Sequence, residues 1–183
     1  MSKLKLDRRV QKSQDAIKNA FTQLMSEKNL DQITIQDISH RANVGRRTIY
    51  DHYMDKFDLL DKLIEEHINE LRKICEAASD LSFAEGNLLW FEYFEHHLPF
   101  FSAMLSSKSA SVFRHHFLAF VIEELEGEVN TTEGINQGLS KEIILNFFGA
   151  AIVEIVEAWL TNGISESTQV IAEQVGVLLD RNF

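Results

Sequence analysis

The sequence predicts an all-α protein, and three observations lead to this fold class. The 183 residues include one proline and eight glycines, too few for a turn-rich β architecture. Apolar side chains recur every three or four residues along most of the chain, as they do in amphipathic helices. The stretch 34–60 has the spacing of two short helices joined by a tight turn. We therefore expect about nine helices, divided into an N-terminal three-helix domain (1–54), a connecting helix (55–80) and a C-terminal helical domain (81–183).

The three N-terminal helices follow from apolar spacing and from the residues that begin and end helices. Apolar residues at helical spacing predict a first helix that ends near residue 28. Thr34 is a good N-cap for a second helix over about 35–42. Asn43 tolerates the left-handed backbone conformation that a tight turn needs, so a third helix is expected over about 46–53. This arrangement is a helix-turn-helix, whose second helix can enter the major groove of DNA.

The side chains of the third helix suit a DNA duplex. Arg46 and Arg47 lie in its first turn, the part of a recognition helix that reaches base edges, and arginine is the commonest specific partner of guanine. Other side chains in this region carry hydroxyl, imidazole or ammonium groups that suit phosphate oxygens. The full set of predicted DNA contacts is Thr34, Arg46, Arg47, Thr48, Tyr50, His52, Tyr53 and Lys56.

The distribution of charge supports a nucleic-acid partner for the N-terminal part only. The formal net charge is −10, which by itself argues against DNA binding. Residues 1–56, however, contain 11 Lys and Arg against 7 Asp and Glu, a net charge of +4. Residues 57–183 contain 7 against 21, a net charge of −14. An acidic remainder repels phosphate and favours docking through the basic part of the chain.

The connecting helix and five further helices are predicted beyond the helix-turn-helix. Asp55 is the expected cap of a long helix that ends near residue 78, and tilting this helix would move the recognition helix. Ser82 and Glu85 form a capping box, and Pro99 breaks the helix that follows. The expected C-terminal helices cover about 82–98, 100–105, 110–127, 143–160 and 167–180.

Aromatic residues are concentrated in the C-terminal domain. Eleven of the thirteen phenylalanines lie beyond residue 80. Such aromatic density can line a pocket for an apolar or aromatic effector, and it can equally form plain core. The predicted pocket residues are Trp90, Phe94, Phe113, Phe117, Phe120 and Phe147.

The last two helices are predicted to form a homodimer interface. The segment 143–160 is apolar on nearly all sides, but Glu154 and Glu157 make insertion into a membrane costly. Two such helices from each of two subunits would make a four-helix interface instead. The predicted interface residues are Phe148, Ala151, Ile155, Trp159, Ile171, Val175 and Leu178.

The order T-x-x-x-I-x-x-x-A-x-V-x-x-x-T-I-Y-x-H-Y-x-D-K-x-x-L-L in residues 34–60 resembles the N-terminal domain of the TetR family of bacterial transcriptional regulators. The resemblance covers roughly residues 8–63. It departs from the family at Asn43, where the family usually has Gly, and at Gly45, where Ser or another polar residue is common. The loss of a hydroxyl at Gly45 could remove one phosphate contact.

The resemblance implies a cytoplasmic homodimer that binds a palindromic double-stranded DNA operator as a repressor and is released by a small-molecule effector. Two recognition helices about 34 to 36 Å apart would fit successive major grooves, and an effector would shift the population away from DNA. The stretch Trp159–Gly163 also resembles a subgroup that includes the dihydroxyacetone kinase activator, which responds to a protein partner. Control by a protein coactivator or a metal therefore stays open as an alternative.

An enzyme is the main competing class. The pairs His96-His97 and His115-His116 could suggest metal or acid–base chemistry, but adjacent helical residues point about 100° apart. No glycine-rich phosphate loop or metal-protease motif occurs, so we expect no enzyme, cofactor or metal. Cys75, the single cysteine, could be a thiol sensor, although packing is the favoured interpretation.

Overall fold

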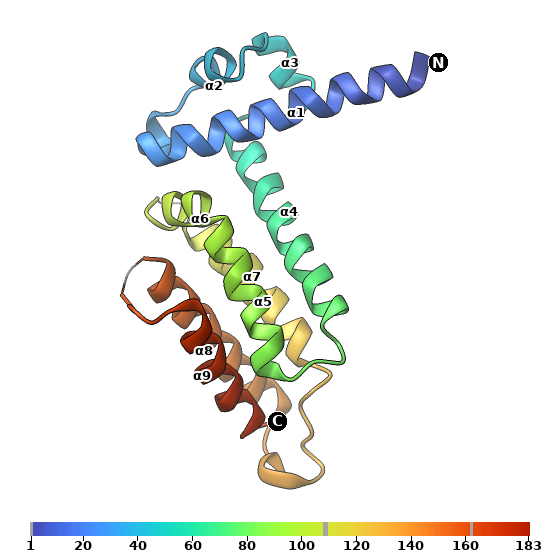
Figure 1. Cartoon of the computed structure of the whole chain (residues 1–183), viewed down its shortest axis with the longest axis vertical. Coiled ribbons are helices and arrows are strands. Elements are labelled where there is room, and N and C mark those ends of the chain that lie inside the picture. Colours follow the sequence, from blue (N-terminus) through green and yellow to red (C-terminus); the bar gives the residue numbers. More distant parts are fainter. Residues whose placement is uncertain (1, 108–109, 162) are drawn as a thin grey trace.

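The computed structural model of the protein describes residues 2–107, 110–161 and 163–183 (Figure 1). Within these residues the chain forms nine α-helices and no strand, which confirms the predicted all-α class. The helices are α1 (Ser2–Glu27), α2 (Ile35–Ala42), α3 (Arg46–Tyr50), α4 (Lys56–Ala77), α5 (Phe83–His96), α6 (Leu98–Leu105), α7 (Ala110–Leu125), α8 (Lys141–Leu160) and α9 (Thr168–Asp180).

Capping and a left-handed residue define the helix-turn-helix. The Thr34 hydroxyl accepts a hydrogen bond from the Asp37 backbone N–H at 3.1 Å, and the Asp37 carboxylate accepts one from the Thr34 N–H at 2.9 Å. This reciprocal pair starts α2. Asn43 then ends α2 with a φ of 53°, in the left-handed conformation that the sequence predicted. The chain turns sharply there into α3.

Helix α3 is shorter than predicted. It ends at Tyr50, and the carbonyl of Ile49 accepts the backbone N–H groups of both His52 and Tyr53, at 3.0 and 2.8 Å. The predicted extension to Tyr53 is therefore a turn. This turn places Tyr53 in the hydrophobic core, which also contains Ile49 and Phe21, and all three are at most 3% exposed.

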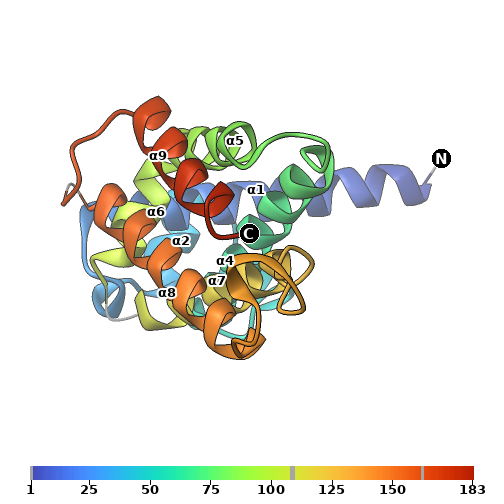
Figure 2. The same cartoon turned by 90° about the horizontal axis from the view of Figure 1, so that it is seen from below.

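Helix α4 joins the N-terminal domain to the rest of the molecule. The Asp55 carboxylate caps it by accepting the backbone N–H groups of Phe57 and Asp58, at 2.8 and 2.9 Å. From there α4 runs along the C-terminal helices and packs against α5 and α7 (Figure 1). Helix α1 also connects the helix-turn-helix to the C-terminal helices, because it packs against both α2 and α6. A view from below shows the C-terminal helices grouped in a bundle, with α1 extending beyond it (Figure 2).

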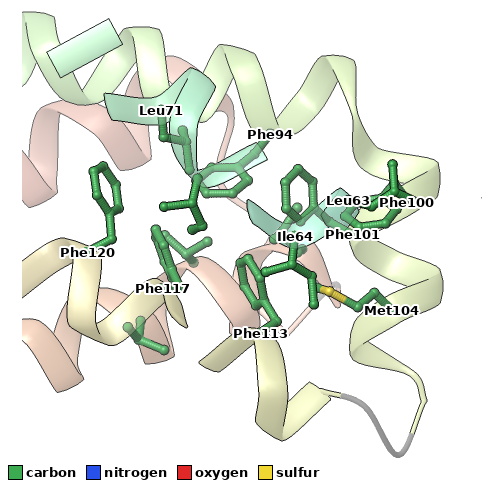
Figure 3. Close-up of a cluster of buried hydrophobic side chains, with 14 of the residues drawn as sticks. Leu63, Ile64, Leu71, Phe94, Phe100, Phe101, Met104, Phe113, Phe117 and Phe120 are labelled. Carbon is green, nitrogen blue, oxygen red and sulfur yellow. The ribbon is translucent and has the colours of Figure 1, made fainter. Parts of the chain in front are cut away.

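An aromatic core fills the C-terminal domain. Side chains from α4, α5, α6 and α7 point toward one another there (Figure 3). Phe113 and Phe117 are stacked with ring centroids 5.2 Å apart, and Phe94 contacts Phe117 edge to face at 5.6 Å. Each of these three residues is 0% exposed. Truncating one fully buried phenylalanine to alanine typically costs about 3 to 5 kcal/mol, so each ring of this cluster contributes substantially to the stability of the domain.

Helix α8 is long and apolar enough to cross a membrane, judged by length and composition alone. Core helices pass the same test, and 44% of the most apolar part of α8 is buried in this fold. It packs against α7, and its Glu157 is 4% exposed and paired with Arg114 on that helix. A core helix with one outward apolar side accounts for its composition.

Helices α5 and α9 approach closely because Gly176 has no side chain. A Cβ atom at this position would lie 2.5 Å from the Ala84 Cα and 2.6 Å from the Ala84 backbone nitrogen. Both are backbone atoms, which cannot move aside without separating the helices.

We predict that Gly176→Ala lowers the melting temperature. Overpacking costs about 1 to 3 kcal/mol, which exceeds the gain of about 1 kcal/mol from replacing a helical glycine with alanine. Thermal unfolding followed by circular dichroism measures the effect. Gly127→Ala is the control, because a Cβ there meets nothing within 4 Å. Equal melting temperatures for the two variants would contradict the close approach.

Candidate functional site

The recognition helix α3 presents two unpaired guanidinium groups. Arg46 and Arg47 are exposed in its first turn, and neither has a hydrogen-bond or ion-pair partner among the described residues. Tyr50 follows with 58% of its surface exposed, and Thr48 is half-buried. The exposed side of α3 therefore carries guanidinium groups that are free to donate hydrogen bonds. The opposite side packs into the core through Ile49, which is 0% exposed.

Other cations near α3 are already paired within the protein. Arg41 makes two hydrogen bonds to the Glu27 carboxylate, at 2.8 and 2.7 Å. Lys28 donates to Asp37 at 2.8 Å, and this bond is the largest cause of the lowered pKa of the Asp37 carboxyl. Lys62 donates to Asp58 at 2.9 Å. Among the Lys and Arg side chains of residues 28–62, only Arg46 and Arg47 therefore lack a hydrogen-bond or ion-pair partner.

Three of the predicted phosphate contacts have other roles in the structure. Lys56 donates to the backbone carbonyls of Leu30, Asp31 and Ile33, at 2.8 to 3.0 Å, so it holds the turn before α2. Tyr53 is 3% exposed, and burial is the largest cause that raises its pKa to about 12. The hydroxyl proton of Thr34 is donated to the Asp37 carboxylate at 2.8 Å.

The Tyr53 assignment is corrected, because its side chain is buried away from a duplex. Thr34 is exposed and Lys56 is half-buried, so their contacts with DNA stay predictions. His52 is half-buried at the end of the turn, and it lies edge to face with Tyr53 at 6.1 Å. Sequence patterns place a residue on a helix but do not show which polar groups the fold has already satisfied.

A cavity of about 380 Å³ lies in the C-terminal domain. It is lined by residues of α4, α5, α7, α8 and α9, and its volume is in the range of small-molecule sites. Trp90 is the one predicted pocket residue that lines it. Asn87, also in the wall, has a side-chain nitrogen that is buried without a hydrogen-bond partner.

The remaining predicted pocket residues are corrected. Phe94, Phe113, Phe117 and Phe120 are 0 to 2% exposed and form the core drawn in Figure 3. Their rings pack on one another, so they leave no space for a ligand. Phe147 is 67% exposed on the outer side of α8. The sequence showed the aromatic content but not which rings meet.

Cys75 lies in the wall of the cavity but is not an activated thiol. Its sulfur accepts a hydrogen bond from the Trp90 indole N–H at 3.0 Å. Burial, followed by the charge of Glu124, raises the pKa of the thiol to about 12. The favoured interpretation of this residue as packing therefore agrees with its surroundings.

The predicted dimer residues divide into exposed and buried sets. Ala151 is exposed on α8, and Leu178 is 50% exposed on α9. Ile171 and Val175 are 4 and 5% exposed, because α9 uses that side to pack against α5. These two are corrected from interface to core. The partly buried members are Phe148, Ile155 and Trp159.

Other exposed apolar residues of α8 and α9 were not predicted as interface residues by the sequence analysis. They are Ile143 (69%), Phe147 (67%) and Val177 (37%). Their periodicity along the helices was visible in the sequence, but an apolar helix buried on several sides gives no sign of which side stays open.

The histidine pairs do not form a metal site in the part of the chain that the structure describes. No group of three or more His, Cys, Asp or Glu side chains there could hold a metal ion. The His96 and His97 rings instead bond to backbone carbonyls of α5, at 2.7 and 2.8 Å.

Comparison with known proteins places this arrangement in a family. The family model described as "Bacterial regulatory proteins, tetR family" matches residues 18–63, and the one described as "Transcriptional regulator C-terminal region" matches residues 82–181. The chain belongs to the TetR family. This TetR family protein is therefore a transcriptional regulator with a helix-turn-helix, as the motif in residues 34–60 predicted. Proteins of this family are generally not enzymes.

A curated relative supports the N-terminal assignment. The uncharacterized HTH-type transcriptional regulator YxbF of Bacillus subtilis (strain 168) is 39% identical over 67 residues, which are 36% of this chain. The match spans 18% of the length of YxbF, so it concerns only part of that protein.

Solved structures share the whole fold. A TetR transcriptional regulator from Streptococcus agalactiae 2603V is 25% identical with a TM-score of 0.68, covering 96% of this chain and 98% of that one. The dihydroxyacetone kinase operon activator DhaS is 24% identical with a TM-score of 0.69, covering 91% and 93%. A putative TetR-family regulator from Syntrophomonas wolfei str. Goettingen is 19% identical with a TM-score of 0.73, covering 93% and 94%.

We predict that Cys75 reacts slowly with thiol reagents in the folded protein. Because its pKa is raised to about 12, the thiolate fraction at pH 8 is small. Alkylation by iodoacetamide should be slower than for an ordinary thiol by about two to three orders of magnitude. Mass spectrometry of the modified chain over time measures the rate. The same thiol in guanidinium chloride serves as the control, and comparable rates in both states would contradict the burial.

Proposed function

We propose that this TetR family regulator is a cytoplasmic homodimer that binds a palindromic operator as a repressor and is released by a small-molecule effector. The observation that carries the proposal is the pair of unpaired, exposed guanidinium groups of Arg46 and Arg47 in the first turn of α3. An arginine fork matches the O6 and N7 atoms of guanine. Because the nearby cations are paired internally, these two are the side chains best placed to specify sequence.

The acidic charge of the rest of the chain supports the same docking side. With a net charge of −14 beyond residue 56, the C-terminal domain repels phosphate. DNA is thereby directed to α3 and its flanks. Tyr50 and Thr48 then supply phosphate or thymine contacts that position the helix.

A two-fold dimer through α8 and α9 would present two such helices to one side of the duplex. The exposed apolar surface of these helices favours this, because isolated proteins rarely leave several large apolar side chains of one surface in water. In the proposed dimer Phe147, Ala151 and Leu178 meet their counterparts across the axis.

Effector control acts in the proposal through α4. This helix borders the cavity at Cys75 and at its C-cap residue Ala78, and it begins six residues after the end of α3. A ligand that favours one position of α4 would change the separation of the recognition helices in the dimer.

We predict that Arg46→Ala or Arg47→Ala weakens specific operator binding by about 1 to 3 kcal/mol and leaves the melting temperature unchanged. Binding to the DNA upstream of the protein's own gene, measured by fluorescence anisotropy across a salt series, tests this. Lys73→Ala removes one positive charge on α4 and is the control, because its side chain pairs with Glu70 away from α3. Undiminished binding by both arginine variants contradicts the assignment, and equal weakening on all sequences makes the residue a phosphate contact.

We predict that Phe147→Glu yields monomers and abolishes tight operator binding. A carboxylate at this position would be buried without a partner in the α8–α9 interface, which disfavours association strongly. Analytical ultracentrifugation reports the mass. Leu98→Glu is the control, since Leu98 is 41% exposed at the start of α6 and lies outside the proposed interface. A Phe147→Glu protein that still sediments as a dimer would place the interface elsewhere.

A further inference from the structure

The charged residues in the wall of the cavity all have the same sign. Glu124, Glu128 and Asp180 contribute carboxylates, and no Lys, Arg or His occurs among the described residues that line it. Trp90 and Phe83 add aromatic surface, and aliphatic side chains complete the wall. A ligand with a carboxylate would be repelled there, whereas a cation would be attracted both by the carboxylates and by aromatic ring faces.

One of these carboxylates is also bound to α4. Arg72 on α4 pairs with Glu124 at 3.3 Å and with Glu123 at 3.0 Å, both on α7. Its guanidinium also lies over the Phe120 ring, 5.2 Å from the centroid. Glu124 faces the cavity, while Glu123 has 61% of its side chain exposed and does not line it. Arg72 thus holds α4 to α7 partly through a residue that a ligand can reach.

We propose that the effector is a small organic cation with an apolar or aromatic body, whose ammonium group competes with Arg72 for the Glu124 carboxylate. This inference rests on the proposed effector control and names the ligand class for that site. The apolar body lies against Trp90 and the aliphatic wall. Because the ammonium group and the Arg72 guanidinium repel each other when both lie at the Glu124 carboxylate, ligand binding weakens the attachment of α4 to α7. Helix α4, which begins soon after the recognition helix α3, is thereby held less firmly to α7.

The ligand class is tested by direct binding to the full chain. Three probes share a phenylpropyl body and differ at one end: 3-phenylpropylammonium, 3-phenylpropanol and 4-phenylbutyrate. Quenching of Trp90 fluorescence is measured in a Trp159→Phe variant, which leaves Trp90 as the single tryptophan, and calorimetry on the unaltered chain checks the result. We expect the ammonium probe to bind at least about tenfold more tightly than the other two. Equal or tighter binding of the carboxylate, or no binding of the ammonium probe at 10 mM or below (about 10,000-fold weaker than a micromolar site), overturns the inference.

Two matched glutamate variants test the contact with Arg72. Glu124→Gln should weaken binding of the ammonium probe about tenfold or more and leave the alcohol probe unaffected. Glu126→Gln removes the same charge just after α7, at a residue that neither lines the cavity nor pairs with Arg72, and should leave probe affinity within about twofold. Thermal unfolding confirms that both variants fold. Equal losses in the two variants would attribute the effect to net charge and overturn the assignment.

Operator binding with and without the ammonium probe separates this inference from the proposed function. Tight probe binding with unchanged operator affinity supports the ligand class but contradicts effector release through α4. Operator binding that responds to the carboxylate probe and not to the ammonium probe supports effector control and overturns the ligand class.

Discussion

Burial of the apolar side of α4 is the constraint on which the rest of this molecule depends. Near its start, Leu59 and Leu60 are 0 and 1% exposed, and Ile64 and Leu71 are fully buried farther along. Those later side chains lie among the aromatic rings of α5, α6 and α7 (Figure 3). Helix α4 therefore has buried side chains both beside the helix-turn-helix and among the C-terminal helices, which is the basis for the effector control proposed above.

Charge pairing is the second organising feature, because it determines which cations remain available to a partner. Lys28, Arg41 and Lys62 have carboxylate partners, and Lys56 is bound to backbone carbonyls. These contacts leave Arg46 and Arg47 as the cations without an internal partner between residues 28 and 62. In the C-terminal domain, by contrast, charge pairing leaves a carboxylate available to a ligand. Arg72 is shared between two carboxylates, so one of them can exchange its partner without leaving the cation unpaired.

The local structure was predictable to a large extent, and the candidate sites were predictable only in part. Capping residues such as Thr34 and Ser82 act within one helical turn, so they could be predicted from the residues next to them in the sequence. Phe117 and Phe147 are the same residue type at helical positions, yet one is 0% and the other 67% exposed. That difference depends on which helix packs on each side. The role of Tyr53 was missed for the same reason, because the turn that ends α3 rotates it inward.

The sequence by itself determined the helical class, the helix-turn-helix with its two arginines, and the separation of a basic N-terminal part from an acidic remainder. These properties follow from local hydrogen bonding, apolar periodicity and charge, which involve residues close together in the chain. Only the tertiary structure decided that the aromatic residues form solid core, that the cavity is lined by Glu124 and Trp90, and that Ile171 faces α5. Those outcomes depend on helices distant in sequence meeting in space, and the angle and register of their packing are set by all the side chains together.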